Sequence, residues 1–301
     1  FKQKTAYEIR LSLVGSEMCI RDRTNDGIMQ PNGLVQARTS TSVAKDVVPR
    51  KQYIAMLDAG SSGTRIYIYD WLQNKESGKL TIQAALSDHS ANQPTWTLKV
   101  EPGLSDFKDK PEHISGYLQP LIAFVEEKIG TNYLREVPIY LKATGGIRLL
   151  QSSDQQKVLQ ATQDYLSTTG FKAAKAAVIT GEAEGVYAWI GVNYLMDKFG
   201  RDKSPYDTFG IVEMGGASIQ LTYVPLAFPT DHQSQVTLGA TPYHLYSYSY
   251  NGLGINSARK NFFDSDTCDV QGYEGKQNLG DFHKCRDLIV RKMISGNCKH
   301  C

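Results

Sequence analysis

The sequence lacks long hydrophobic runs and any strong excess of charge. No stretch approaches the roughly 20 uninterrupted apolar residues that a membrane-spanning helix needs. Basic residues number 33 and acidic residues 31, which leaves a formal net charge of +2 with both signs scattered along the chain. Nucleic-acid binders usually concentrate basic residues on one face, and no such concentration is visible in the sequence. We therefore expect no nucleic-acid partner.

Cysteine is scarce and unevenly placed. Of the five cysteines, Cys19 stands alone near the start. The other four fall in the last part of the chain: Cys268, Cys285, Cys298 and Cys301. An even, late group predicts two disulfides and an oxidising compartment. Because zinc takes four convergent ligands and His300 lies between the last pair, a zinc site is the alternative.

What the sequence does contain predicts a globular fold that begins after a tail. Hydrophobic residues make up 41% of the 301 residues, enough for one large core or two ordinary ones. Residues 1–23 show no clear amphipathic face, and Glu17 interrupts their apolar run, so they do not read as a signal peptide. We interpret them as translated adapter sequence, with a loosely docked helix as the alternative. Residues 24–50 are polar and rich in serine and threonine, as in a linker.

Strands and helices alternate from residue 51 onward, which predicts the α/β class. Apolar patterning predicts strands near 54–57, 65–71, 137–141, 175–179, 208–212 and 219–224. It also predicts helices over 111–130, from an N-cap at Ser153 to residue 166, and over 185–199.

Two segments repeat one plan, in which an acid ends an apolar strand, glycines and hydroxyls form a turn, and a second strand leaves. One is DAGSSGT, from Asp58, and the other is EMGGAS, from Glu213. A repeat in the two halves of a chain predicts a duplicated pair of domains that face each other across a cleft. We place these domains at 51–178 and 179–301, after a tail over 1–50.

Both glycine turns are suited to phosphate. Glycine lets backbone N–H groups converge on an anion, and hydroxyls add donors at Ser61, Ser62, Thr64 and Ser218. Asp58 and Glu213 would repel that anion unless Mg²⁺ or Ca²⁺ lay between them, held partly through water. A strand follows each turn and GxxxxGK[ST] is missing, so the turns match neither a Walker loop nor a Rossmann fingerprint. Simple hairpin turns are the alternative.

A carboxylate in TGEAEG, Glu184, can take a proton from a water that attacks a terminal phosphate. The alternative is an acid placed at a helix start, where the dipole favours it. Ser218 and Gln220 could hold the same water, or could be ordinary polar strand residues. Arg148, in KATGGIR, could steady phosphate charge, although a lone loop arginine is usually solvated.

The segments DAGSSGTR, KATGGIR, TGEAEGVYAWIGVNYL and EMGGASIQL, in this order and spacing, resemble the first four conserved regions of the nucleoside triphosphate diphosphohydrolases, or apyrases. The resemblance covers roughly residues 52–301. It implies an actin-like ATPase fold, with two ribonuclease-H-like domains whose mixed sheets are flanked by helices and a nucleotide cleft between them. It also implies stepwise hydrolysis of nucleoside tri- and diphosphates to monophosphates by water, dependent on Ca²⁺ or Mg²⁺.

The resemblance also implies roles, residue by residue. Glu184 matches the catalytic base, and Ser218 and Gln220 match the pair that orients the water. Asp58 and Glu213 match acids that hold the water shell of the metal, although the family usually has aspartate where Glu213 stands. The matching phosphate-binding positions are Ser61, Ser62, Gly63, Thr64, Thr144, Arg148, Gly215, Gly216 and Ala217.

The end of the chain carries further implications of the resemblance. The family pairs cysteines at the positions Cys268–Cys285 and Cys298–Cys301, which implies secretion or residence in the secretory lumen. Family members continue past the position of Cys301 with a fifth conserved region. We therefore expect a C-terminally truncated chain, whose full-length parent could carry a membrane anchor.

Three alternatives to an apyrase stay open at this point. An exopolyphosphatase of the same superfamily shares the two-turn plan. A non-hydrolysing module could bind a nucleotide and switch conformation. The chain as given could also be an inactive nucleotide-binding fragment. The helix motif EGVYAWIGVNYL and the late cysteines favour an apyrase.

Overall fold

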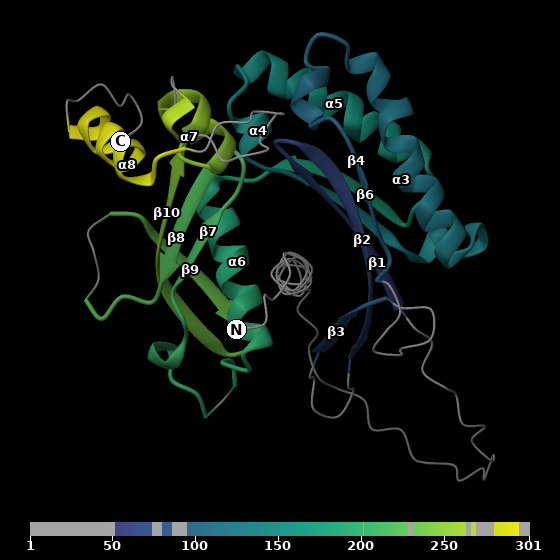
Figure 1. Ribbon diagram of the computed structural model, residues 1–301. Helices are drawn as coiled ribbons and strands as arrows, with labels where there is room; N and C mark the ends of the chain where they lie inside the picture. Colours follow the sequence, from purple (N-terminus) through teal and green to yellow (C-terminus); the bar gives the residue numbers. More distant parts are fainter. Residues whose placement is uncertain are drawn as a thin grey trace.

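The computed structural model describes residues 52–73, 80–85, 95–200, 202–227, 231–262, 266–268 and 280–294. They form two lobes, each built on one β-sheet (Figure 1). Among these residues, no helix has both the length and the apolar content needed to cross a bilayer. The predicted tail over 1–50, Cys19 within it, and the predicted pair Cys298–Cys301 lie outside the described residues.

The first lobe contains a six-stranded mixed sheet in the order β3-β2-β1-β5-β6, with β4 paired to β2. Antiparallel pairing joins β1 to β2, β2 to β3 and β2 to β4, whereas β5 runs parallel to both β1 and β6. The strands are β1 (Gln52–Gly60), β2 (Gly63–Gln73), β3 (Leu80–Ala84), β4 (Thr97–Val100), β5 (Pro138–Ala143) and β6 (Ala173–Val178).

Two long helices, α3 (Ile114–Ile129) and α5 (Ser152–Thr168), cover one face of this sheet (Figure 1). The predicted apolar face of α3 is buried in the core: Ile114, Leu118, Leu121, Ile122 and Val125. Burying such side chains supplies roughly 1.5–3 kcal/mol each relative to leaving them exposed. A smaller cluster on the opposite face includes Ile54 and Met56 and packs against Leu195.

The second lobe contains a four-stranded antiparallel sheet in the order β7-β8-β10-β9. Its strands are β7 (Ile211–Met214), β8 (Ser218–Tyr223), β9 (Gln233–Leu238) and β10 (Thr241–Asn251). Helix α6 (Gly181–Leu195) packs on the side of this sheet that faces the first lobe (Figure 1). Its Trp189 is fully buried beside Tyr243 and Phe199, with ring centroids 5.4 Å apart in both pairs.

Shorter elements complete the two lobes. The helices are α4 (Gly145–Arg148), α7 (Ile255–Phe262) and α8 (Phe282–Ile294). The 3₁₀ turns are η1 (Leu104–Phe107), η2 (Pro111–His113), η3 (Thr131–Glu136), η4 (Pro205–Asp207) and η5 (Asp266–Cys268). A disulfide joins Cys268 in η5 to Cys285 in α8, the pairing that the resemblance implies.

The predicted strands and helices are confirmed, with corrections at their ends. The N-cap of α5 is Gln151 and not Ser153, because Gln151 has the extended backbone that precedes a helix and Ser153 already lies in the first turn. The helix predicted from residue 185 begins at Gly181, after the cap Thr180. The tyrosine-rich segment LYSYSY, for which we made no strand prediction, lies in β10. The domain boundary after residue 178 stays a prediction.

Candidate active site

Three glycine-containing turns meet between the lobes: the β1–β2 hairpin tip, the start of α4 at residues 145–146, and the turn at residues 215–217. Ser61 and Ser62 form the tip of the β1–β2 hairpin, between the paired residues Gly60 and Gly63. A Cβ atom placed on Gly216 would lie 2.3 Å from Ser61 Oγ, and one on Gly146 would lie 2.8 Å from Ser61 Cα. Because real Cβ atoms do not approach so closely, glycine is what lets these segments come together.

The hairpin tip is braced from behind. A Cβ atom on Gly103 would lie 2.4 Å from Ser61 O, so residue 103 packs directly on the turn. The Tyr117 hydroxyl donates a hydrogen bond to Pro102 O (2.6 Å), and burial raises the pKa of this tyrosine. Thr64 is fully buried in the ladder, whereas Ser62 is exposed at the tip. The predicted phosphate contacts of both residues stay predictions.

The second turn, at residues 215–217, is held through its carbonyl groups. They accept hydrogen bonds from Ile255 N–H to Gly215 O (3.0 Å), Asn256 N–H to Gly216 O (2.9 Å) and Gly252 N–H to Ala217 O (2.8 Å). A trans peptide points each C=O and the following N–H in opposite directions. The N–H groups of residues 216 and 217 therefore point away from the start of α7, and the N–H of Ser218 points away from Gly252. Successive amides presented in this way are the form in which a backbone binds anions.

Glu184 lies in the first turn of α6. Thr180 caps the helix, since its Oγ1 accepts a hydrogen bond from Ala183 N–H (3.1 Å), as an N-cap threonine does. The Glu184 carboxylate accepts from Arg148 Nη2 (2.7 Å) and Gln220 Nε2 (3.3 Å), and its side chain is 19% exposed. These contacts place it in a polar network as well as near the helix dipole.

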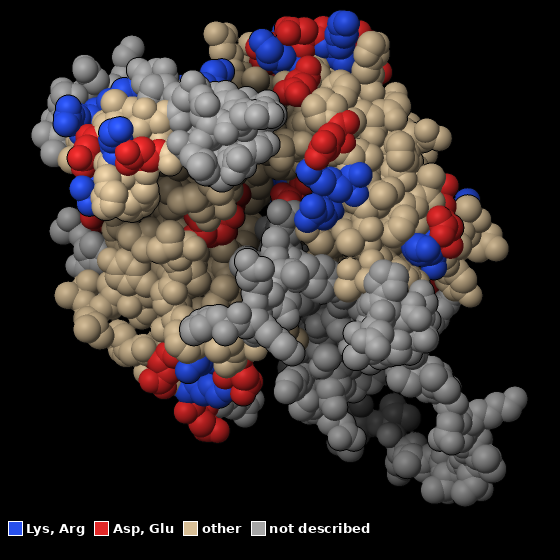
Figure 2. Space-filling view, in the orientation of Figure 1, with Lys and Arg blue, Asp and Glu red and all other residues tan. Residues whose placement is uncertain are grey.

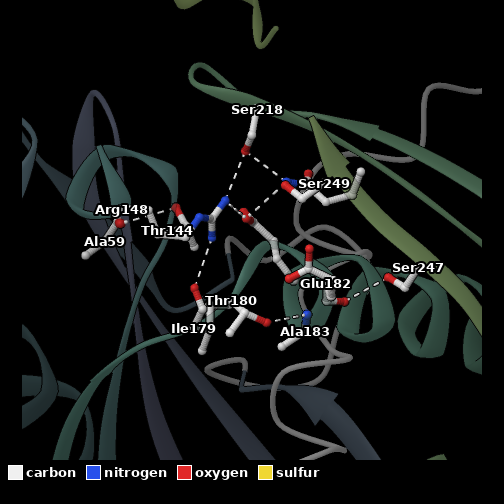
Figure 3. A network of polar contacts seen from close by, with 12 residues as sticks. Ala59, Thr144, Arg148, Ile179, Thr180, Glu182, Ala183, Ser218, Ser247 and Ser249 are labelled. Carbon is white, nitrogen blue, oxygen red and sulfur yellow. Dashed lines mark hydrogen bonds and ion pairs between the residues drawn. The ribbon is translucent and has the colours of Figure 1, made fainter. Parts of the chain in front are cut away.

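Arg148 connects the lobes (Figure 3). It ends α4 in the first lobe, and its Nη1 donates to Ile179 O (3.1 Å). Its Nη2 donates to Glu184 Oε2 (2.7 Å) and to Ser218 Oγ (3.1 Å) in the second lobe. A guanidinium has five N–H donors, so these bonds leave donors for a ligand. The predicted contact of Arg148 with phosphate stays a prediction.

Gln220 forms the buried side of the network. Its side chain is fully buried, and its Nε2 lies 2.8 Å from Ser218 Oγ and 2.9 Å from Ser249 Oγ. Its Oε1 is also buried and has no hydrogen-bond partner in the part of the chain that the structure describes. A buried amide oxygen without a partner is costly unless a water or ligand reaches it.

Thr144 ties α4 to the end of β1. Its backbone N–H donates to Ala59 O (3.1 Å), and its Oγ1 lies 3.4 Å from the same oxygen. A Cβ atom on the next residue, Gly145, would lie 2.9 Å from Ala217 Cβ and 3.2 Å from Ser218 Oγ. The KATGGIR segment therefore contacts the turn at residues 215–217 through Gly145 and the hairpin tip at Ser61 through Gly146. Its position in the sequence does not reveal these contacts.

The two acids predicted to hold a metal, Asp58 and Glu213, lie near the ends of corresponding strands, β1 and β7. Asp58 shares a strand face with Met56, which lies on the side of the first sheet that contacts α6. Glu213 shares a face with its cross-strand partner Gln220 in the second sheet. Acidic side chains border the hollow between the lobes in Figure 2. Among the described residues, no three side chains of the kinds that bind metals cluster.

Sequence reasoning missed the hydroxyls of β10. Ser249 contacts Gln220, while Ser247 Oγ lies 2.8 Å from Thr222 Oγ1 and donates to Glu182 O (2.9 Å). The signal was present in the alternating serines and tyrosines of LYSYSY, since alternate residues of a strand share one face. That face meets the first turn of α6.

Comparisons with known proteins show what this chain is similar to. The model of the GDA1/CD39 (nucleoside phosphatase) family matches residues 46–298. The probable apyrase 5 of Arabidopsis thaliana is 34% identical, over 83% of this chain and 58% of the relative. The guanosine-diphosphatase of Schizosaccharomyces pombe is 32% identical, over 70% of this chain and 38% of the relative. The chain thus spans only part of the length of these relatives.

Among solved structures, a nucleoside triphosphate hydrolase from Neospora caninum matches with a TM-score of 0.53 and 19% identity. The match covers 71% of this chain and 46% of that chain. At this identity the likeness concerns the fold alone. Together with the two described sheets, it shows the two-lobed α/β architecture of the actin-like ATPases.

Proposed function

Because this chain belongs to the GDA1/CD39 nucleoside phosphatase family, we propose that it is an apyrase-type enzyme that hydrolyses nucleoside tri- and diphosphates to monophosphates. The observation that carries the proposal is the meeting of Glu184, Arg148, Ser218 and Gln220 beside the three glycine turns. The family match favours nucleoside phosphates over the polyphosphate alternative.

The donors and acceptors that Ser218, Gln220 and Glu184 have left indicate how a water would be bound. Ser218 Oγ lies within hydrogen-bond distance of two donors, Arg148 Nη2 (3.1 Å) and Gln220 Nε2 (2.8 Å). A serine hydroxyl has two acceptor sites and one proton, so its proton is left to donate. A water that accepts from Ser218 and donates to Glu184 and Gln220 Oε1 keeps one lone pair for the phosphorus.

The chemical step follows from this arrangement. Glu184 takes a proton from the water, and the water oxygen forms a bond to the terminal phosphorus. The bond from that phosphorus to the bridging oxygen breaks, and the nucleotide shortened by one phosphate leaves. Arg148 fixes the orientation of the Glu184 carboxylate through its 2.7 Å ion pair. Positioning and general-base catalysis of this kind together provide a large part of such rate enhancements.

The glycine turns would bind the phosphate chain. Backbone amides at Gly216, Ala217 and Ser218 and donors at Ser61 and Ser62 would hold the oxygens that gain charge. Gly215 would shape the turn, since its own N–H donates to Ser218 O (3.0 Å). Thr64, Thr144 and Gly63 support the same turns. A divalent cation, Ca²⁺ or Mg²⁺, held through water by Asp58 and Glu213, would neutralise phosphate charge when bound.

The disulfide Cys268–Cys285 supports an oxidising compartment for this enzyme. We propose that it acts in the secretory lumen or outside the cell, on nucleotides present there.

The assignment of the base is tested with a matched pair of variants. Glu184→Gln and Glu182→Gln each remove one acid from the first turn of α6. Phosphate release from ATP and ADP is measured with Ca²⁺ or Mg²⁺ and with EDTA. Loss of a general base lowers kcat by about 10²–10⁴-fold, so we expect this loss in Glu184→Gln and less than about threefold in Glu182→Gln. Unchanged activity in Glu184→Gln, or a preference for long-chain polyphosphate over ADP, would contradict the proposal.

A further inference from the structure

Small polar side chains cover the part of the second sheet that meets the start of α6. The cross-strand partners Ser249 and Gln220 lie beside the partners Ser247 and Thr222. All four side chains are buried, with Ser249 6% exposed and the other three at 0%. None of the predicted catalytic roles involves Ser249, although it contacts Gln220, one of the residues proposed to hold the water.

Ser249 contacts two parts of the machinery at once. Its Oγ lies 2.9 Å from Gln220 Nε2. A Cβ atom on Gly181, the first residue of α6, would lie 2.2 Å from both Cβ and Oγ of Ser249. The helix that carries Glu184 therefore begins directly on this serine, and position 181 has no room for a side chain.

The side-chain nitrogen of Gln220 has more hydrogen-bond acceptors nearby than it has N–H groups to donate. Its Nε2 carries two N–H groups, but three oxygens lie nearby, at 2.8 Å (Ser218), 2.9 Å (Ser249) and 3.3 Å (Glu184). The two short contacts fix the plane of the amide and hence the position of Oε1. Without the Ser249 oxygen, one N–H is released and the amide is free to rotate toward Glu184.

We propose that Ser249 is a positioning residue for the reaction proposed above. It holds the Gln220 carboxamide in one orientation and seats the first turn of α6, so that Glu184, Ser218 and Gln220 remain aimed at the same water. Ser249 itself contacts neither the water nor the nucleotide. The proposal rests on the proposed function, and its test separates the two.

Ser247 offers an internal comparison. It also contacts the first turn of α6, through Glu182 O, but its side-chain partner is Thr222 and not Gln220. If seating the helix were the whole role of Ser249, Ser247→Ala and Ser249→Ala would lower kcat equally. If the orientation of Gln220 matters, Ser249→Ala has the larger effect.

The kinetic test is a double-mutant cycle with ADP as substrate. The variants are Ser249→Ala, Gln220→Ala and the double variant, with Ser247→Ala beside them. A buried neutral hydrogen bond corresponds to about tenfold in rate. We expect Ser249→Ala to lower kcat about tenfold while KM changes less than about twofold. In the Gln220→Ala background we expect the same substitution to change kcat less than about twofold.

Equal losses in both backgrounds, or an equal loss in Ser247→Ala, would overturn the proposal. If Glu184→Gln abolishes turnover while Ser249→Ala is as active as the parent, the proposed function stands and this inference fails. Full activity of Glu184→Gln refutes the proposed base and leaves the orientation of Gln220 to be decided by a measurement without substrate.

That measurement follows the side-chain amide of Gln220 by NMR, with its signal identified by its loss in Gln220→Ala. We expect Ser249→Ala to shift this signal and to speed its hydrogen exchange with water. Thr162→Val is the control, since it deletes another buried hydroxyl, which donates to Val158 O (2.7 Å) within α5. An unchanged Gln220 signal in Ser249→Ala would overturn the inference, whatever the activity of the chain.

Discussion

Two acids in the first turn of α6 differ in what their side chains meet. Glu182 and Glu184 share the favourable end of the helix dipole. The Glu184 carboxylate also accepts hydrogen bonds from Arg148 and Gln220 and is 19% exposed. The two acids lie two positions apart in the same motif, so the sequence alone does not distinguish them. The contacts of the Glu184 side chain do.

The ion pair of Arg148 gives a prediction at this scale. Arg148→Ala removes donors from Ile179 O, Glu184 and Ser218 together. The pair is mostly buried, so its loss leaves a carboxylate without its partner, and we expect about 1–3 kcal/mol of lost unfolding free energy. We also expect kcat for ADP to fall by about 10²-fold, because the base loses its orientation.

Arg148→Lys is the informative companion, since one ammonium cannot reproduce the fork of a guanidinium. We expect it to recover part of the stability and little of the activity. Arg135→Ala, in η3, serves as the control. Urea unfolding and steady-state kinetics report both quantities, and an Arg148→Ala protein with parental stability would refute the connecting role of this side chain.

At the scale of the element, α6 depends on small residues where it crosses the second sheet. Cβ atoms placed on Gly181 and Gly185 would lie 2.2 Å from Ser249 Oγ and 2.4 Å from Thr222 Oγ1. Glycine disfavours a helix by about 1 kcal/mol relative to alanine. Close approach of α6 to the sheet therefore comes at a cost in helix propensity, and it brings Glu184 to Gln220.

Two glycine substitutions test whether close packing of α6 on the sheet outweighs its low helix propensity. Gly181→Ala gains helix propensity but pushes α6 away from Ser249, and overpacking of this kind costs about 1–3 kcal/mol. Gly116→Ala, in α3, meets no atom within 4 Å and should stabilise by about 0.5–1 kcal/mol. Thermal unfolding of both variants should shift in opposite directions, and stabilisation by Gly181→Ala would show that α6 does not seat as closely as described.

At the scale of the whole molecule, the proposed site exists only where the lobes meet. The hairpin tip at Ser61 and the turn at Gly216 come from different sheets, and Arg148 reaches from one lobe into the other. A ligand that binds both turns would therefore stabilise the lobes against each other.

Nucleotide binding should accordingly raise the melting temperature. With Mg²⁺ and a non-hydrolysable ATP analogue at 100 times its Kd, mass action adds about 2.7 kcal/mol to the unfolding free energy. We expect the shift to disappear with EDTA. Differential scanning calorimetry measures it, and a shift produced equally by adenosine, which has no phosphate, would argue against the glycine turns as the binding elements.

Much of the fold, and the positions of the glycine turns in it, could be predicted from the sequence because the signals are local. The turn at Ser61 and Ser62 needs neighbouring glycines, and the apolar stripe of α3 repeats at the helical period. The predicted N-cap of α5 was wrong by two residues, because Gln151 has no side-chain cap bond that the sequence could signal. β10 was not predicted, since its serines and tyrosines do not alternate as polar and aliphatic residues do in most half-buried strands.

The sequence by itself determined where the glycine turns, the acids and the hydroxyls stand, since backbone freedom and side-chain period depend on neighbouring residues. Tertiary structure alone decided which of them touch. Arg148 meets Glu184 across 36 residues of chain and Ser218 across 70, and Gln220 meets Ser249 across 29. Such pairs depend on the register of two sheets and on the seating of α6 between them, and no local pattern encodes either.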